Sequence, residues 1–548
     1  MTSSHAGQVF HYHEETKHSF HRFARSLGYM DWATQPDPFR SYKRVEIISL
    51  RLQETDRNAS HLDLYERTRN PFCRFNLENI AAFMELSLGL SAWKSFAGNR
   101  WALRINPSSG NLHPTESYLL LPPIHSTMGG VFHYHPYWHA LERRADLPER
   151  IWKRLYAHFQ CDGFLIALTS IFWRESWKYG ERAFRYCNHD LGHALAALSF
   201  SANLLGWKVT YLKNVSDDDI DTLLGFRKSS WVQGEGECSE LVCMIHGAEH
   251  TVKGQEFPRE LLDEFRQTSF YGIPNQLSSD HANWEIISKV AIATNKTKSA
   301  DREMKRYRTT PYSRKAQSLL SATQIIRQRR SLLACDGKTS ISMNQFFEMI
   351  DKTLPRESCV PFDISLGESQ LHLFLFVHRV TNLSPGLYYF VRNENQLEEL
   401  KTNSRKDFAW QLVEAGFPLY FLLKGNFQRE ATLVSCNQSI AGDSAFSLGM
   451  IAHFRTPIET DPHMYRRLFW ESGMIGQALY LEAEAHGVRS TGIGCFFDNP
   501  VHEIIGLRGN DFQDLYHFTV GGPVDDQRLE TNPPYRHLEH LSYSSRAG

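Results

Sequence analysis

The sequence predicts an α+β fold built from two related domains in tandem, which pack together as an intramolecular pseudo-dimer. Two observations predict it. At 548 residues the chain is long enough for two to four domains, and its 42% content of hydrophobic residues suits globular domains with cores. Three weak internal matches also recur in the same order in the two halves, as expected for two copies of one domain.

The first of these matches pairs two expected strands, each of which leads into a polar turn. The second pairs two expected helices, which have small and apolar residues at helical spacing and a glycine at a C-cap position. The third match has the same offset as the helices. Chance similarity between amphipathic helices would explain the second match, but not the shared order and offset. The matching segments are Gly130–Tyr134 with Gly386–Phe390, Gly192–Gly206 with Gly473–Gly487, and Leu224-Gly225 with Ile505-Gly506.

We expect four segments along the chain. Residues 1–60 form an N-terminal extension packed on the first domain, which spans 61–254. A polar linker at 255–315 leads to the second domain at 316–548. The end of the linker, Lys296–Lys315, holds eight Lys and Arg against two acidic residues. A solvated linker face is a better explanation of this stretch than a patch that binds anions or nucleic acid.

Composition excludes several classes of protein. The net charge of −1 argues against a nucleic-acid or membrane-surface protein. No apolar run reaches about 18 residues, so we expect no membrane-spanning helix. Nine scattered cysteines make no disulfide framework, and Cys238 and Cys243 have no second pair for a zinc site. The chain begins without the features of a signal peptide, and a reducing cytoplasm fits best.

Two histidine pairs, His11 with His13 and His133 with His135, raise the question of a metal site. Residues two apart share a face in a strand, so two ligands could converge. No carboxylate or cysteine is evident at ligand spacing, so we expect a structural role and no metal. His113 is a better candidate for a pocket residue, although no role can be assigned to it.

Arg329-Arg330-Ser331 follows an expected helix and offers two guanidinium groups. Such groups make planar, bidentate contacts to phosphate. Positive charge at the N1–C2=O edge of a flavin also stabilises its anionic reduced ring. A flavin mononucleotide needs both kinds of contact. By itself, the triplet equally fits a helix end with solvated arginines.

Two other segments supply complementary groups. The loop Pro107–Asn111 (PSSGN) offers two hydroxyls and an amide, although it could also be a turn that caps the next helix. Gly492-Ile493-Gly494 would let backbone N–H groups approach a ligand, or form a plain helix-to-strand turn. More than 200 residues separate Asn111 from Arg329. These groups can therefore form one site only if the two halves pack together.

Taken together, these motifs resemble those of the nitroreductase-like flavoenzymes. The closer resemblance is to the SagB-type dehydrogenases, the azoline oxidases of thiazole- and oxazole-modified peptides, and it covers most of 60–250 and 316–540. It implies FMN at an interface, with the Arg-Arg-Ser and glycine segments on one side and the Pro-Ser-Ser-x-Asn loop on the other. The cofactor-binding residues that it implies are Pro107, Ser108, Ser109, Asn111, Arg329, Arg330, Ser331, Gly492, Gly494 and, by a softer alignment after Gly521-Gly522-Pro523, Arg528.

A Lys-Tyr pair associated with catalysis in the azoline oxidases matches Lys178-Tyr179. Oxidation of a C–H bond by a flavin needs a base, and Lys178 could serve if burial or nearby cations lower its pKa. Tyr179 could assist proton transfer or orient the substrate. Without the resemblance, the pair would simply be a surface lysine on an amphipathic helix and a half-buried aromatic.

Each half also departs from the family pattern. The first has Asn70–Phe72 about where Arg-Arg-Ser is expected, and Val209–Tyr211 in place of Gly-x-Gly. The second has Asp363–Leu366 near the place of the Pro-Ser-Ser loop, and Met464–Arg466 in place of the Lys-Tyr pair. A symmetric dimer has two equivalent sites. This chain should therefore keep one FMN site and have a degenerate second one.

The sequence thus predicts an FMN-dependent oxidoreductase, a SagB-type dehydrogenase that oxidises a peptide-derived or natural-product substrate with hydride transfer to FMN. One alternative is an NAD(P)H-dependent nitroreductase-type reductase of small aromatics. Another is a flavin-free scaffold or peptide-binding pseudoenzyme. The expected partners are a peptide or small-molecule substrate and, if one exists, a biosynthetic partner enzyme, with no nucleic acid and no membrane. The fold could function as a monomeric pseudo-dimer.

Overall fold

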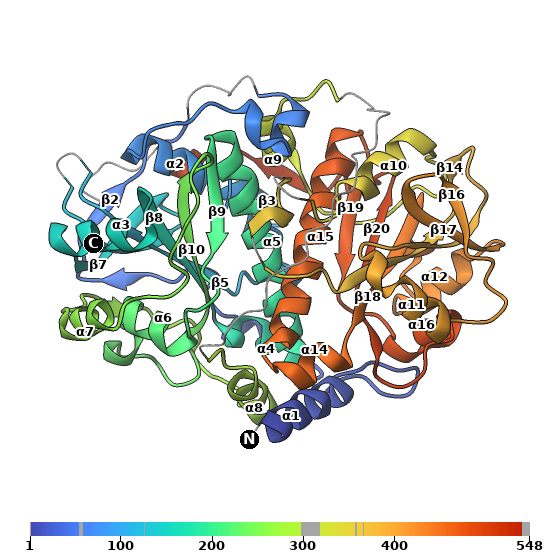
Figure 1. Ribbon diagram of the computed structural model, residues 1–548, viewed down its shortest axis with the longest axis horizontal. Coiled ribbons are helices and arrows are strands. Elements are labelled where there is room, and N and C mark those ends of the chain that lie inside the picture. The colour runs from blue at the N-terminus through green and yellow to red at the C-terminus, as the bar shows by residue number, and fades with distance from the viewer. Residues whose placement is uncertain are drawn as a thin grey trace.

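The chain folds into two α+β halves that lie side by side, the first coloured blue to green and the second yellow to red (Figure 1). Each half is built around one seven-stranded sheet. The computed structural model describes residues 2–53, 59–124, 127–297, 318–356, 359–364 and 366–539.

The two large sheets have the same strand arrangement, and every neighbouring pair of strands is antiparallel. In spatial order the first sheet contains β2 (Ile47–Ser49), β7 (Ala140–Asp146), β6 (Gly130–His135), β5 (Thr115–Leu121), β8 (Gly163–Ser170), β10 (Cys238–Gly247) and β9 (Trp207–Tyr211). The second contains β16 (Gln411–Glu414), β17 (Phe417–Lys424), β15 (Gly386–Phe390), β13 (Leu371–Val377), β18 (Phe446–His453), β20 (Phe512–Gly521) and β19 (Arg489–Ile493).

Two long helices pack against each other at the centre of the molecule (Figure 1). Helices α5 (Ala183–Leu204) and α15 (Met464–Ala485) each have 22 residues and are offset by 281 positions, 464 minus 183. Gly192 and Gly473 correspond under this offset and meet each other, since a Cβ on Gly192 would lie 2.9 Å from the Cα of Gly473. A residue that contacts its own counterpart marks a two-fold axis. The close approach also requires the absence of side chains at both positions.

Two buried ion pairs across the interface obey the same symmetry. Arg185 binds Asp498 at 2.8 Å, and its counterpart Arg466 binds Asp217 at 2.6 Å. The two aspartates begin the corresponding helices α6 (Asp217–Leu224) and α16 (Asp498–Ile505), which are also offset by 281, 498 minus 217. The predicted fold class, two α+β domains packed as an intramolecular pseudo-dimer, is confirmed.

The edge strands distinguish the two halves. Strand β2 precedes the other strands of its sheet in the chain, whereas β16 comes between β15 and β17 in the chain.

The N-terminal helix α1 (Thr2–Glu15) packs against α8 (Glu285–Ala293) and also against α14 (Arg455–Thr460) of the second half. The N-terminal segment therefore contacts both halves.

A third sheet joins the halves directly. Strand β21 (Glu530–Asn532), near the C-terminus, pairs with β3 (Leu90–Phe96), which pairs with β4 (Asn99–Arg104).

Most of the basic stretch Lys296–Lys315 lies outside the described residues. The other helices and short strands are α2 (Leu77–Glu85), α3 (Glu149–Phe159), α4 (Phe172–Tyr179), α7 (Arg259–Gln267), α9 (Ala322–Gln328), α10 (Met343–Asp351), α11 (Leu397–Asn403), α12 (Gln428–Val434), α13 (Ser439–Gly442), β1 (Tyr42–Lys43), β11 (Ile273–Pro274), β12 (Ile341–Ser342) and β14 (Val380–Thr381).

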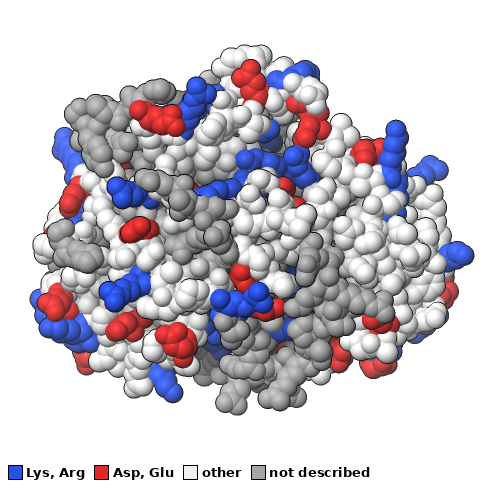
Figure 2. Space-filling model, turned by 90° about the horizontal axis from the view of Figure 1, so that it is seen from above, with Lys and Arg blue, Asp and Glu red and all other residues white. Residues whose placement is uncertain are grey.

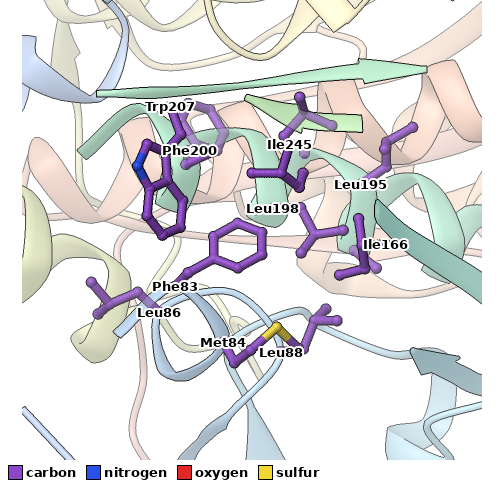
Figure 3. Close-up of a cluster of buried hydrophobic side chains, with 14 of the residues drawn as sticks. Phe83, Met84, Leu86, Leu88, Ile166, Leu195, Leu198, Phe200, Trp207 and Ile245 are labelled. Carbon is purple, nitrogen blue, oxygen red and sulfur yellow. The ribbon is translucent and has the colours of Figure 1, made fainter. Parts of the chain in front are cut away.

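Apolar side chains from helices and sheet fill the core of the first half (Figure 3). Phe83 of α2, Leu198 of α5 and Trp207 of β9 are fully buried there. Such burial is the main source of the folding free energy.

Among the described helices, none combines the length and the apolarity that a membrane crossing needs. Acidic and basic side chains are interspersed over the face in Figure 2.

Candidate functional site

A cavity of about 970 Å³ lies between the two halves and is lined by both. This volume is at the upper end of the roughly 300–1,000 Å³ typical of cofactor and small-molecule sites. The cavity brings together the three segments that the sequence separates. The predicted site residues that line it are Pro107, Ser108, Ser109, Asn111, Tyr179, Arg329, Arg330, Ser331, Gly492 and Gly494.

The arginine segment lies beside the glycine segment because it adds to the edge of the second sheet. A capping box of Ser321 and Gln324 begins α9, which ends just before Arg329. Ser331 then forms a parallel bridge with Ser490 of β19. Two of the predicted cofactor-binding segments are therefore neighbours in space.

Arg329 is buried, at 3% exposure. Its Nη2 donates to the carbonyls of Arg104 and Ile105 in the first half, at 3.0 and 3.2 Å, and its Nε has no hydrogen-bond partner among the residues that the structure describes. Arg330 donates to the carbonyl of Ser91 at 3.0 Å. Within the described ranges, no carboxylate forms an ion pair with either arginine. Burial lowers the pKa of Arg329, and burial together with the Arg329 charge lowers the pKa of Arg330 to about 10.

This arrangement fits an anionic ligand. A buried guanidinium with an unused N–H donor is costly unless a negative group meets it. A phosphate would supply both charge and acceptor oxygens.

The Pro107–Asn111 loop faces Lys178 and Tyr179 at the end of α4. Gly110 has φ 59°, in the left-handed region that favours glycine. A Cβ there would lie 2.6 Å from the Tyr179 Oη and 3.2 Å from the Lys178 Nζ. Tyr179 lines the cavity, whereas Lys178 is half-buried beside it, with its Nζ 5.3 Å from the Tyr179 ring centroid. The structure thus places the Lys-Tyr pair at the tip of the loop.

Hydrogen bonds inside the loop use several of its polar atoms. The Asn111 Nδ2 donates to the Ala102 carbonyl at 2.9 Å, and its Oδ1 lies 3.0 Å from the His113 Nε2. The His113 N–H donates to the Ser108 Oγ at 2.8 Å. His113 lines the cavity, and burial lowers its pKa well below the usual value. These contacts hold the shape of the loop, which includes left-handed backbone at Asn111 and His113.

The glycines of the third segment accommodate tyrosine rings. A Cβ on Gly492 would lie 1.9 Å from the Tyr516 Oη, and one on Gly494 would lie 2.3 Å from the Tyr186 Cε1. The Gly492 N–H donates to the Tyr480 Oη at 3.2 Å. Substitution of either glycine would therefore displace the aromatic wall of the cavity.

A pair of buried carboxylates below the loop was missed by the sequence analysis. Asp190 of α5 accepts hydrogen bonds from the Ser109 N–H and hydroxyl, both at 3.0 Å. Burial raises the pKa of Asp190 to about 7, although hydrogen bonds from Ser108 and Ser109 oppose the shift. Burial and then the Asp190 charge raise the pKa of Glu175 well above its usual value. The pair can therefore hold a proton near neutral pH.

A helical signal for part of this wall was present in the sequence. Tyr186, Asp190 and His193 are spaced i, i+4, i+7, share one face of α5 and line the cavity. Glu175 gave no such signal, because it lies on α4, across the turn at Gly180.

The structure places Arg528 outside the cavity. Its side chain is 72% exposed and pairs with Asp526 at 2.7 Å. Three other cations, Lys94 of β3, Arg104 of β4 and Arg489 of β19, line the cavity and were missed by the sequence analysis. Arg489 pairs with Asp525 at 2.5 Å.

The histidine pairs lie away from this cavity. His11 and His13 belong to helix α1 rather than to a strand. His133 lies between the carboxylates of Glu116 and Glu142, at 2.9 and 2.8 Å, in a buried cluster. In the part of the chain that the structure describes, no group of three or more His, Cys, Asp or Glu could hold a metal ion.

A second, much smaller cavity of about 30 Å³ occupies the position related to the first by the pseudo-two-fold axis. At the offset of 281, three residues that line the large cavity correspond to three that line the small one. The correspondences are Tyr186 with Arg467, Asp190 with Glu471, and His193 with Met474.

An ion pair lies beside this second position. Strands β5 and β13 are offset by 256 (371 minus 115), which makes Asp363 the counterpart of Pro107. Arg67 donates to the two Asp363 carboxylate oxygens at 2.6 and 2.8 Å. Burial raises the pKa of Asp363, but Arg67 more than offsets this and leaves it lowered. Ser365, from the same segment, lies outside the described residues.

One sequence correspondence is wrong. Three residues separate the short helix from the long one in each half, at 180–182 and 461–463. Lys178-Tyr179 therefore corresponds to Glu459-Thr460 at the end of α14, and not to Met464–Arg466. The latter segment matches Ala183–Arg185, and its Arg466 forms the interface ion pair described above.

Comparison with known proteins supports the fold. No protein-family model matches the chain, and no curated protein matches it either. A solved structure of a putative nitroreductase from Anabaena variabilis ATCC 29413 superimposes with a TM-score of 0.68 and 22% identity, over 94% of this chain and 99% of that one.

Two further solved structures match less of the chain. The E. coli microcin synthetase McbBCD complex with truncated pro-MccB17 has a TM-score of 0.27 and 18% identity, over 45% of this chain and 94% of that one. A putative nitroreductase in complex with FMN from Exiguobacterium sibiricum 255-15 has a TM-score of 0.22 and 14% identity, over 38% and 92%. The fold assignment rests on the Anabaena structure. The chain has a nitroreductase-like fold along nearly its whole length.

Proposed function

We propose that this chain is an FMN-dependent oxidoreductase that holds one FMN across the interface between its halves. The observation that supports this most is the cavity of about 970 Å³, where three segments distant in sequence meet around buried Arg329. Nitroreductase-like architecture along the chain is consistent with it.

Arg329 and Arg330 would hold the phosphate, with Ser331 beside them. Both guanidinium groups contact backbone carbonyls of the first half, so phosphate binding would also join the halves. The Pro107–Asn111 loop and the Gly492–Gly494 segment would border the flavin ring. When bound, FMN would supply hydride transfer.

The groups that would move a proton come from the first half. Oxidation of a C–H bond releases a proton, and we assign the base to Lys178 with assistance from Tyr179. Both side-chain ends reach the loop at Gly110. Below it, Glu175 and Asp190 hold a proton, and Asp190 positions Ser109. Removal of a general base typically costs about 10²–10⁴ in rate.

The Lys-Tyr pair favours the SagB-type branch, with an azoline-containing peptide or related natural product as substrate. A biosynthetic enzyme that forms the azoline would then be the partner. In this proposal the reaction takes place in the cytoplasm.

The absorbance spectrum of the purified protein tests the proposal. We expect a flavin spectrum and one FMN per chain. A colourless protein that also fails to bind added FMN would contradict the cofactor assignment, and two tightly bound flavins would contradict the filled second site. Anaerobic mixing then tests the branch. Bleaching by an azoline peptide supports the dehydrogenase, whereas rapid bleaching by NADPH alone would identify a nitroreductase-type reductase.

A further inference from the structure

Two cysteines from different loops meet in the wall of the large cavity. Cys436 follows α12, and Cys495 follows Gly494 and lines the cavity. Their sulfur atoms are 2.8 Å apart although 59 residues separate them in the chain. Both side chains are half-buried, and neither forms a disulfide. Only a small approach is needed to reach the roughly 2.05 Å of an S–S bond.

The loops that hold these cysteines are fixed to each other on both sides of the sulfur contact. The Phe497 N–H donates to the Val434 carbonyl at 2.8 Å. The Gln438 Nε2 donates to the Cys495 carbonyl at 3.1 Å. Cys436 itself has φ 53°, a conformation that residues other than glycine seldom adopt. The meeting of the two thiols is therefore built into the backbone of both loops.

The charge around Cys495 favours its thiolate. The hydrogen bond with Cys436 lowers the pKa of Cys495 most, and the buried guanidinium of Arg182 lowers it further, against the opposing effects of burial and of Asp498. Arg182 is close because its Nη2 donates to the Gly494 carbonyl at 3.2 Å. The thiolate is the form that attacks disulfides and other electrophiles.

We propose that Cys436 and Cys495 are a redox-active thiol pair in the cavity wall, which low-molecular-weight disulfides convert into an intramolecular disulfide. The accessible Cys495 thiolate attacks one sulfur of the small disulfide, whose S–S bond breaks to release a thiolate. The Cys436 thiolate then attacks the Cys495 sulfur of the mixed disulfide, and the second small thiol leaves. The two protein thiols lose two electrons, the small disulfide gains them, and the two cysteine protons pass to the released thiols.

This reaction would join the loop after α12 to the segment that contains Gly492 and Gly494. It needs no flavin, so it stands apart from the proposed function. Failure of FMN binding would leave it untouched.

Peptide mapping tests the proposal. The reduced full-length chain is treated with glutathione disulfide, free thiols are alkylated, and the digest is analysed without reduction. We expect one cross-linked peptide that joins Cys436 to Cys495 and disappears on treatment with dithiothreitol. In Cys436→Ser the resolving thiol is missing, so Cys495 should instead keep one glutathione. A parent chain that binds glutathione separately at both cysteines, or leaves both alkylatable, would overturn the proposal.

Cys335 provides the matched control. It is also half-buried, but burial raises its pKa to about 12, and no second cysteine contacts it in the described part of the chain. Cys335→Ser should form the same cross-link as the parent. In Cys436→Ser the hydrogen bond from the Cys436 thiol is lost, but the Arg182 guanidinium still favours the Cys495 thiolate. Cys495 should therefore acquire glutathione at least about tenfold faster than Cys335. Equal rates at Cys495 and Cys335 would contradict the proposal that the surroundings of Cys495 make its thiol more reactive.

Discussion

The two positions related by the pseudo-two-fold axis differ about thirtyfold in volume, 970 against 30 Å³. In the large cavity, buried Arg329 contacts backbone carbonyls and the Tyr480 ring, and its Nε finds no acceptor among the described residues. Beside the small one, Arg67 makes a bidentate contact with the Asp363 carboxylate. The same architecture thus leaves a cation for a ligand on one side and neutralises it internally on the other.

The largest expected effect concerns the pair at the loop tip. Lys178→Ala should retain flavin but lose about 10²–10⁴ in turnover, because the general base is removed. Flavin content by absorbance and steady-state rates with substrate measure the two quantities. The counterpart variant Glu459→Ala, exposed on α14, is the control and should change neither. Parent-level turnover in Lys178→Ala, or loss of its flavin, would remove Lys178 from the assignment.

The next effect is on stability at the filled position. Arg67→Ala leaves the buried Asp363 carboxylate unpaired, which should lower the free energy of unfolding by about 3–5 kcal/mol. Flavin content should stay at one per chain under folding conditions. Chemical denaturation measures the first quantity and absorbance the second. A variant that loses flavin while its stability is unchanged would show that the small cavity, too, contributes to the cofactor site.

Arg329→Ala should have the opposite profile. It removes charge-assisted hydrogen bonds to phosphate of about 1.5–3 kcal/mol each, so FMN affinity should fall at least about tenfold. Stability of the flavin-free chain should fall less than in Arg67→Ala, because hydrogen bonds to carbonyls are lost but no carboxylate is left unpaired. Titration of the apoprotein with FMN gives the affinity. The exposed Arg528→Ala is the control, and equal losses in the two variants would contradict the assignment of the phosphate to Arg329.

The smallest effect is on the pH dependence of stability. Burial raises the pKa of Asp190 to about 7 in the folded chain. The folded state therefore binds the Asp190 proton more tightly than the unfolded state does, and deprotonation removes this stabilisation. Its contribution to stability is present below about pH 4 and is lost as pH rises toward 7. Asp190→Asn should flatten that decline by on the order of 1 kcal/mol.

Melting temperatures at pH 5 and pH 8 measure this effect. The counterpart Glu471 pairs with Arg392 at 2.5 Å, so Glu471→Gln should instead destabilise the chain at both pH values. Parallel pH profiles for the parent and Asp190→Asn would show that Asp190 keeps its charge throughout.

Patterns in the local sequence were sufficient to predict features that repeat along the chain or lie within one continuous segment. The offset helices, their C-cap glycines and the three cavity segments were all predicted from such patterns. The pairing of segments from different halves could not be read in this way. Lys94 lies beside the second half because β21 returns to pair with β3, which spacing along the chain does not reveal. The position of Arg528 depends on the same returning segment. Glu175 meets Asp190 only because α4 and α5 turn at Gly180.

The contact of Gly192 with Gly473 has a consequence for how such a molecule can change over generations. In a dimer of identical subunits, every mutation appears on both sides of the axis, so one site cannot be lost without the other. Here the two helices that cross at these glycines are encoded separately. Each half can accumulate its own substitutions while the shared crossing is preserved. An aspartate at 363 and a proline at 107 can therefore coexist, and a mutation harmful to one cavity need not be tested by selection in the other.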